Sequence, residues 1–274
     1  MIRSAITISL VPEARGGPFV FWDGLEAGCE RAAAHGFDAV EVFPRSAEEC
    51  GAETIRRATE ARGLRVAAIG TGAGWVAHRL RLTDPDAGVR RQAVDFVRSI
   101  MRLAAGFGAP AIIGSMQGRA EAGVTRDESL KWLVDALAEL GEDAVRLGAP
   151  LLIEPLNRYE TNLLNTVEDA LGVITRAGAS QLRVLCDLFH MNIEETSVPG
   201  ALRRVGDRLG HVHLADSNRR AAGLGHTDLE PVAEALVEMG YAGYVSAEVL
   251  PLPDAETAAS RTMGSFRALF RRSS

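Results

Sequence analysis

Residues 151–166 read LLIEPLNRYETNLLNT, and the character of this stretch changes after its third residue. Leu151 to Ile153 form an apolar run that is typical of a buried parallel strand. The run ends on the carboxylate of Glu154, and Pro155 then prevents the strand from continuing. Such a strand delivers a charged side chain to the edge of a sheet, where either a solvent loop or the rim of an active site follows.

The same unit, an apolar run followed by a segment with helical spacing, repeats along the chain. Between the runs, Ala, Leu, Arg and Glu recur every three to four residues, for example in residues 85–108 and 125–148. Asp86 and Thr125 stand where helix N-caps are expected, and glycines such as Gly36 and Gly148 stand where helix C-caps are expected. The apolar runs predict parallel strands at residues 6–11, 39–43, 64–70, 111–115, 151–155, 182–187, 209–215 and 244–250.

Eight strands that each precede a helix predict an α/β protein with the (β/α)8 TIM-barrel fold, as one domain over residues 1–274. The rival fold is a doubly wound open sheet, which needs a glycine-rich phosphate turn after its first strand. The first predicted strand is followed by PEARGGPF, and GTGAG at residues 70–74 lacks the GxGxxG spacing. The pattern therefore favours the barrel and predicts no nucleotide cofactor.

The composition narrows the class of protein. The chain has 274 residues, 47% hydrophobic and 24% charged, as in soluble globular proteins, and its net charge of −6 disfavours a nucleic-acid partner. Cys29, Cys50 and Cys186 form no CxxC pair, which is typical of a reducing compartment. No apolar run is long enough to span a membrane, and the N-terminus lacks the pattern of a signal peptide. We expect a cytoplasmic protein without a membrane partner.

Four residues with ligand side chains stand at or near the ends of the last four predicted strands: Glu154, Asp187, His213 and Glu248. In a TIM barrel these ends meet at one rim. Each residue taken alone is more often structural, but a buried carboxylate is costly unless a cation compensates it. Three oxygen donors and one nitrogen suit a divalent ion, and we expect Mn²⁺, with Mg²⁺ and Co²⁺ as alternatives. His211 faces the same side of the strand as His213, so it is an alternative ligand. We prefer His213 as the ligand because it is nearer the end of the strand.

Three phrases carry a resemblance to a known family: IEPLNRYETNLLNT, CDLFHMNIEE and GHVHLADSNRRAAGLGHTDL. They resemble the motifs of the ketose 3-epimerases, the D-tagatose/D-psicose 3-epimerase group of the xylose-isomerase-like TIM-barrel superfamily. The strong match covers about residues 150–250, and a looser one reaches back to about residue 70. Family members are commonly dimers or tetramers, so the resemblance also predicts a homo-oligomer.

The resemblance implies roles for particular residues. Glu154, Asp187, His213 and Glu248 would bind the metal, and Glu154 and Glu248 would also act as the two acid/base groups. The resemblance further implies that the substrate's oxygens are held by Glu160, His190 and Arg219. The chain departs from the family at Ala215 and Asp216, where Gly-Glu is usual, after Glu248, and in its first-strand region. These departures lie in regions that shape the sugar pocket, so the sequence does not identify the sugar substrate.

The predicted function is metal-dependent epimerisation of a ketose at C3, through an enediolate and two carboxylates. The main alternative is an aldose–ketose or hydroxypyruvate-type isomerase with the same metal site, and inosose-type isomerases and dehydratases stay open. An apurinic endonuclease would need more histidine ligands and a basic surface, which six histidines and a net charge of −6 disfavour. A non-catalytic sugar-binding barrel is disfavoured because both acid/base carboxylates are retained.

Overall fold

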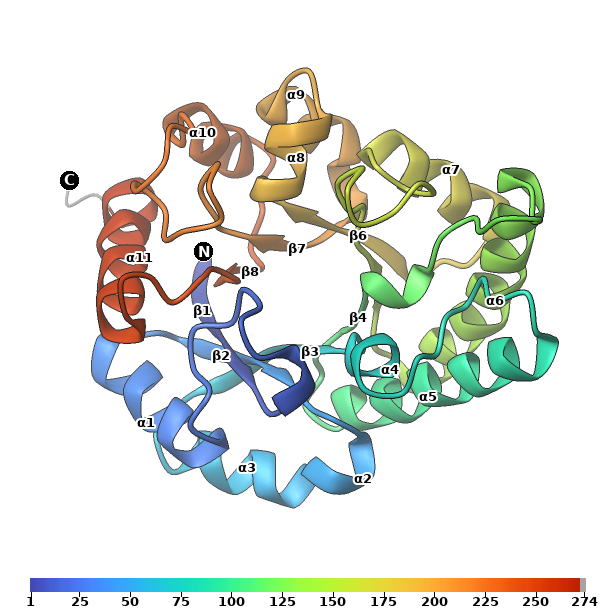
Figure 1. Cartoon of the computed structure of the whole chain (residues 1–274). Helices are drawn as coiled ribbons and strands as arrows, with labels where there is room; N and C mark the ends of the chain where they lie inside the picture. The colour runs from blue at the N-terminus through green and yellow to red at the C-terminus, as the bar shows by residue number, and fades with distance from the viewer. Residues whose placement is uncertain (272–274) are drawn as a thin grey trace.

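The apolar runs form parallel strands that pair with their neighbours in chain order, and β8 closes the barrel on β1 (Figure 1). The computed structural model describes residues 1–271. The strands are β1 (Arg3–Ser9), β2 (Ala39–Phe43), β3 (Arg65–Gly70), β4 (Ala111–Ile113), β5 (Leu151–Ile153), β6 (Leu182–Asp187), β7 (Leu209–His213) and β8 (Tyr244–Ala247). The predicted α/β fold, a (β/α)8 TIM barrel, is confirmed.

Helices follow each strand and form a ring outside the barrel (Figure 1). The α-helices are α1 (Leu25–His35), α2 (Ala47–Cys50), α3 (Ala52–Glu60), α4 (Ala73–Val76), α5 (Ala87–Ala105), α6 (Arg126–Leu147), α7 (Val167–Ala177), α8 (Leu188–Glu194), α9 (Val198–Val205), α10 (Glu230–Glu238) and α11 (Ala255–Phe270). Short 3-10 turns are η1 (Pro12–Ala14), η2 (Ser115–Gln117) and η3 (Gly206–Arg208). Among residues 1–271, no helix is both long and apolar enough to cross a membrane.

The helix ends follow the local sequence signals. The Asp86 side chain accepts hydrogen bonds from the first turn of α5, and Thr125 and Glu128 form a reciprocal capping box at α6. Gly36 and Gly148 end α1 and α6 in the left-handed conformation, which other residues adopt only at a steric cost. The predicted caps at these four helix ends are therefore confirmed.

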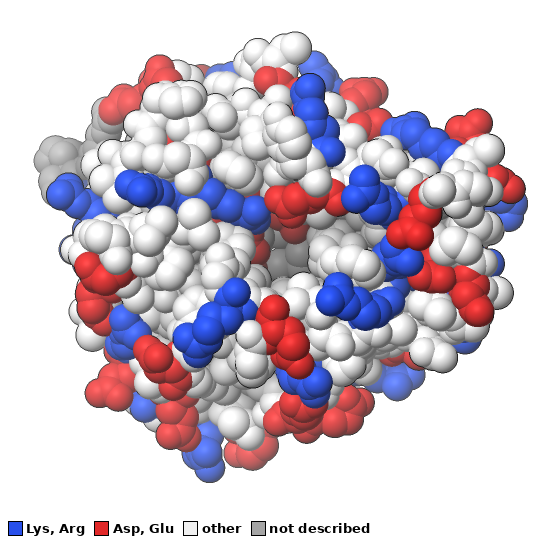
Figure 2. Space-filling model, viewed as in Figure 1, with Lys and Arg blue, Asp and Glu red and all other residues white. Residues whose placement is uncertain are grey.

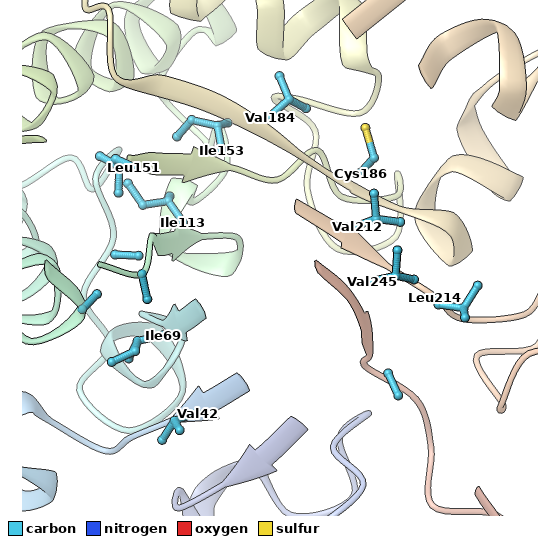
Figure 3. Packing of buried hydrophobic residues seen from close by; sticks show 14 of the residues in the cluster. Val42, Ile69, Ile113, Leu151, Ile153, Val184, Cys186, Val212, Leu214 and Val245 are labelled. Atoms are coloured by element: carbon cyan, nitrogen blue, oxygen red, sulfur yellow. The ribbon is translucent and has the colours of Figure 1, made fainter. Parts of the chain in front are cut away.

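Alternation along the strands separates two packing surfaces. In β5, Leu151 and Ile153 belong to the main core between strands and helices, whereas Leu152 belongs to a small cluster with Ala68, Ile112 and Leu185. Figure 3 shows the labelled residues of the main core on, or directly after, successive strands around the barrel. Because side chains alternate with period two, the residues in phase with Leu152 face the barrel interior. Glu154 is the next residue in that phase.

Two predicted strand boundaries were wrong by about three residues. The first strand begins at Arg3 instead of residue 6, because Arg3 and Ser4 already pair with β8. The last strand ends at Ala247 instead of residue 250, because the backbone N–H of Glu248 turns back to the carbonyl oxygen of Ser246, at 3.2 Å. Glu248 therefore lies in the loop that directly follows β8.

Candidate functional site

Four predicted ligand residues meet at the carboxyl-terminal end of the barrel. Glu154 follows β5, Asp187 ends β6, His213 ends β7 and Glu248 follows β8. One ligand atom from each residue lies within 4.8 Å of the others. The Nδ1 atom of His213 is 3.5 Å from Glu154 Oε1, 3.4 Å from Asp187 Oδ2 and 3.5 Å from Glu248 Oε2. These distances bring three carboxylates and one imidazole to a common centre.

The atoms at this centre have the properties that a cation site requires. Glu154 Oε1, Asp187 Oδ2 and His213 Nδ1 are buried and have no hydrogen-bond partner. Buried polar atoms without partners are destabilising, and buried carboxylates are more so. Three oxygen donors and one imidazole nitrogen are a suitable ligand set for a hard or borderline divalent ion. The residues at the centre therefore fit a divalent metal.

Local structure orients two of the carboxylates. Asp187 is also the N-cap of α8, and its Oδ1 atom accepts hydrogen bonds from the backbone N–H groups of Phe189, at 2.7 Å, and His190, at 3.4 Å. This leaves Oδ2 facing the centre. The Glu154 carboxylate lies against Gly114, where an added Cβ would sit 2.5 Å from Oε2. A larger residue at position 114 would displace the Glu154 carboxylate from this position.

The two histidines of β7 differ in what they face. His213 belongs to the four-residue group, whereas His211 Nε2 contacts Glu41 Oε2 at 2.9 Å. Glu41 also contacts His213 Nε2, at 3.2 and 3.3 Å, and all three side chains are buried. If both imidazoles donate from Nε2 to Glu41, Nδ1 of His213 keeps its lone pair toward the centre. The geometry thus favours His213 over His211 as the ligand residue.

Burial and neighbouring charges shift the pKa values of these groups. Burial raises the pKa of Glu248 from 4.5 to about 8. Burial also opposes ionisation of Asp187, but the neighbouring side chains of His190, His213 and Arg219 outweigh it and lower the pKa of that carboxyl. For His213, burial opposes protonation, but Glu41 and Glu248 outweigh it, so its pKa lies well above 6.5. The metal-free centre therefore holds protons that a bound cation would displace.

His190 has a defined orientation at the edge of the centre. Its Nδ1 atom accepts a hydrogen bond from the backbone N–H of Asn157, at 3.2 Å, and lies 2.8 Å from the Asn157 side-chain nitrogen. This assigns the ring proton to Nε2. Nε2 lies 3.9 Å from Glu154 Oε1 and 3.8 Å from Asp187 Oδ2. His190 can therefore donate a hydrogen bond to an oxygen bound at the centre.

Arg219 connects the remaining predicted residues. Its guanidinium donates to Glu248 Oε2 at 3.0 Å and to Glu160 Oε1 at 3.1 Å. Arg219 has a positive φ of 58°, which is uncommon outside glycine. The buried Asp216 supports this loop by accepting from the backbone N–H groups of Ser217, Gly223 and Thr227, at 2.7 to 3.0 Å. Asp216, a departure from the family motif, thus holds the loop that positions Arg219.

A cavity of about 360 Å³, here called the inner cavity, opens above the centre. Figure 2 shows a hollow in the middle of this face, with charged side chains of both signs around its mouth. Apolar residues on its wall include Phe19 from the loop after β1, Phe43 at the end of β2, and Leu156 from the loop after β5. The inner cavity is also lined by Glu41, Glu154, Glu160, His190, His213, Arg219 and Glu248. Its size and mixed lining are typical of a small polar ligand site.

The sequence placed all seven predicted site residues at this rim, but it missed Glu41 and Asn157. Glu41 lies in the middle of the apolar run AVEVF, and a lone carboxylate in a buried strand was itself a signal. Asn157 had no comparable signal, because an asparagine after a proline is common in loops.

Comparisons with known proteins identify the family to which the chain belongs. The model of the family described as xylose isomerase-like TIM barrel matches residues 29–269. D-psicose 3-epimerase of Agrobacterium fabrum is 31% identical over 242 residues, which cover 86% of this chain and 79% of that protein. D-psicose 3-epimerase of Enterocloster bolteae is 42% identical over 107 residues, and 3-dehydro-D-guloside 4-epimerase of Escherichia coli is 39% identical over 119 residues. These two matches cover 39% and 43% of this chain, and only 36% and 45% of the relatives' lengths.

A solved structure shares the fold over nearly the whole chain. The apo form of 3-keto-D-glucoside 4-epimerase from E. coli superposes with a TM-score of 0.82 at 24% identity, and covers 98% of this chain and 100% of its own. The resemblance to ketose 3-epimerases that the motifs predicted is supported by the Agrobacterium relative over most of both chains. This chain therefore belongs to the xylose isomerase-like TIM barrel family.

Proposed function

We propose that this protein is a divalent-metal-dependent epimerase that inverts C3 of a ketose. The observation that carries the proposal is the set of buried, unpartnered atoms of Glu154, Asp187 and His213 around one centre. Glu154 and Glu248 line the same inner cavity as the two candidate hydrogen-bonding residues His190 and Arg219. The relatives named as D-psicose 3-epimerases support the choice of reaction.

Two carboxylates are sufficient for the proton transfers. A divalent ion held by Glu154, Asp187, His213 and Glu248 would supply positive charge that stabilises an enediolate. Glu154 and Glu248 directly follow β5 and β8, which are not neighbours in the barrel. One carboxylate takes the C3 proton and the carboxylic acid of the other returns a proton to the opposite face, which inverts that carbon. Their roles exchange when the reaction runs backward.

The neighbouring groups assist at defined atoms. His190 donates from Nε2, because Asn157 occupies Nδ1. Arg219 holds Glu248 in place through its 3.0 Å hydrogen bond, and it brings a fixed positive charge to the cavity. Donors that are already oriented stabilise developing negative charge without reorganisation. Glu160 is held by both Arg219 and Asn157, so its carboxylate is positioned to bind substrate hydroxyl groups.

The reaction type is tested with D-fructose, D-psicose and D-tagatose, and with fructose 6-phosphate, in deuterated water with Mn²⁺. We expect an inverted product that carries deuterium at C3, detected by NMR. Deuterium at C1 or C2, instead of C3, would identify aldose–ketose isomerisation, which is the alternative reaction for the same centre.

Glu41 is expected to control the affinity of the centre for its ion. In Glu41→Gln, the neutral amide no longer supplies the negative charge that both imidazoles face, and its NH2 group, which can only donate, replaces one of the two acceptor oxygens. We expect Mn²⁺ affinity to fall by about 10- to 100-fold in isothermal titration calorimetry. Glu53→Gln, at an exposed position on α3, is the matched control and should bind as the parent does. Unchanged affinity in a folded Glu41→Gln protein would contradict this role.

Mn²⁺ binding is expected to tighten as the pH rises. The pKa of Glu248 is about 8 in the metal-free protein, and the carboxyl must lose its proton to bind a cation. Affinity should rise by up to about tenfold per pH unit for each proton displaced, from about pH 6 to 8. Calorimetry in two buffers with different ionisation enthalpies measures the protons released. Equal affinity at pH 6 and pH 8 would contradict the raised pKa.

The raised pKa of Glu248 makes the metal-free fold less stable as the pH rises, whereas it makes Mn²⁺ binding tighter. The folded pKa of Glu248 lies above the ordinary value of 4.5, so the folded state binds more protons than the unfolded chain between these values. The contribution of Glu248 to stability is therefore present at pH 4 to 5 and is lost as the pH rises toward 8. Denaturant melts of the metal-free parent and of Glu248→Gln measure this loss. The free energy of unfolding should fall more steeply with pH in the parent than in Glu248→Gln.

A further inference from the structure

A second cavity of about 380 Å³, here called the side cavity, opens beside the inner cavity. The two cavities share Val76, Ser115, Leu156 and Glu160 as lining residues, so they adjoin at one border. The side cavity extends from this border to Trp75, Arg81, Gly118 and Arg119. Each cavity by itself reaches the volume of a small-ligand site, which is about 300–1,000 Å³.

Hydrogen bonds between three βα loops fix the walls of the side cavity. The backbone N–H of Leu82 donates to Met116 O at 2.9 Å, and Thr83 Oγ1 donates to Gln117 O at 2.9 Å, which joins the loops after β3 and β4. Thr161 Oγ1 donates to Gly118 O at 2.7 Å, which joins the loops after β4 and β5. The side cavity is therefore formed before any ligand arrives.

The lining combines apolar surface with a few polar groups. Trp75, Val76 and Leu156 contribute apolar surface, and Ser115 contributes a hydroxyl group. Arg119 is exposed and has no ion-pair partner among the described residues. An aromatic side chain beside hydroxyl and guanidinium donors suits a ring that has apolar C–H faces and hydroxyl groups at its edges.

The charge balance disfavours a phosphate in the side cavity. The guanidinium of Arg81 is already paired with Asp84, at 2.7 Å, and with Glu121. Its Nε atom is buried and has no hydrogen-bond partner, so one neutral acceptor on a ligand would satisfy it. The carboxylate of Glu160 lies on the border and shares the single charge of Arg219 with Glu248, so the negative charge left there would repel a dianion. Arg119 is the remaining positive charge among the lining residues, which is too little for a phosphate dianion beside Glu160.

We propose that the side cavity binds a second, neutral sugar ring that is attached to the ketose, so that the preferred substrate is a glycosylated ketose. The inference rests on the proposed function, because the ketose end occupies the inner cavity. Glu160, on the border, lies beside the position where the two sugar units are joined. A free hexose would occupy the inner cavity alone and leave the contacts of the side cavity unused.

The test compares D-fructose with two glucosylfructoses, linked through O1 and through O6, on the Mn²⁺-loaded enzyme. We expect kcat/KM for one of the glucosylfructoses to exceed that for fructose by about tenfold or more, the range that added pocket contacts provide. Arg119→Ala and Trp75→Ala should each reduce this ratio toward one. Binding is followed independently through the fluorescence of Trp75, which Trp75→Phe should remove. Trp132→Phe, on the outer helix α6, is the matched control and should keep the binding signal.

The outcomes separate this inference from the proposed function. Turnover of fructose with no preference for either glucosylfructose, and no tighter binding of them, would overturn the side-cavity inference and leave the epimerase standing. Tight binding of a glucosylfructose that depends on Arg119, without turnover of any ketose, would support the side cavity and overturn the epimerase. A preference for fructose 6-phosphate over both glucosylfructoses would overturn the neutral-ring assignment. Arg119→Ala alters an exposed side chain, so it keeps the test decisive if Trp75→Ala fails to fold.

Discussion

Replacing Glu248 by glutamine is expected to lower kcat for ketose epimerisation by about 10³- to 10⁴-fold at saturating Mn²⁺. The amide has nearly the shape of the carboxyl group, but it can neither take a proton from C3 nor return one. The hydrogen bond from Arg219 at 3.0 Å can persist to the amide oxygen, so the cavity should keep its shape. The loss then reports on proton transfer.

The isotope pattern makes this prediction sharper. In deuterated water, Glu248→Gln should retain C3 exchange only for the epimer whose hydrogen faces Glu154, and should form no inverted product. Mn²⁺ affinity is measured on the same protein, to separate proton transfer from loss of a ligand atom. Glu168→Gln, at an exposed position on α7, is the control. Retained turnover in Glu248→Gln would remove Glu248 from the mechanism.

Removal of the metal by chelation is expected to reduce activity by about 10³-fold or more, and added Mn²⁺ should restore it. A divalent charge at the reacting oxygens contributes several kcal/mol to the stability of the transition state, and each 1.4 kcal/mol changes the rate about tenfold. Arg219 carries a single positive charge that Glu248 and Glu160 already share, so it cannot replace a divalent ion at the centre. Full activity after exhaustive chelation would contradict the proposed cofactor.

Thermal melting provides a second measurement of metal binding at this centre. An ion at about 100 times its Kd stabilises the folded state by about 2.7 kcal/mol, which corresponds to a rise in Tm of roughly 5–10 °C. Asp187→Asn removes one anionic ligand that is fully buried, so its Tm should respond much less to Mn²⁺. An equal response in both proteins would place the ion somewhere other than this centre.

The sequence by itself determined the barrel and most of the candidate site. The repeated order of apolar run and helical segment is local, and eight repeats leave few ways to bury every strand. Glu154, Asp187, His213 and Glu248 could be predicted as a group because all carboxyl-terminal strand ends of a barrel meet at one rim. The sequence also predicts that Leu152 and Glu154 face the same side of the sheet, because side chains alternate along a strand.

Only the tertiary structure decided which buried groups face one another across the barrel. Glu41 contacts His211 and His213 although about 170 positions separate them in the chain, and no local pattern encodes that distance. The choice of His213 over His211, the proton on Nε2 of His190 and the side cavity all depend on such contacts. Periodicity tells which face of its own strand a residue occupies. Closure of the barrel and the packing of the loops on its rim determine which residues it meets there.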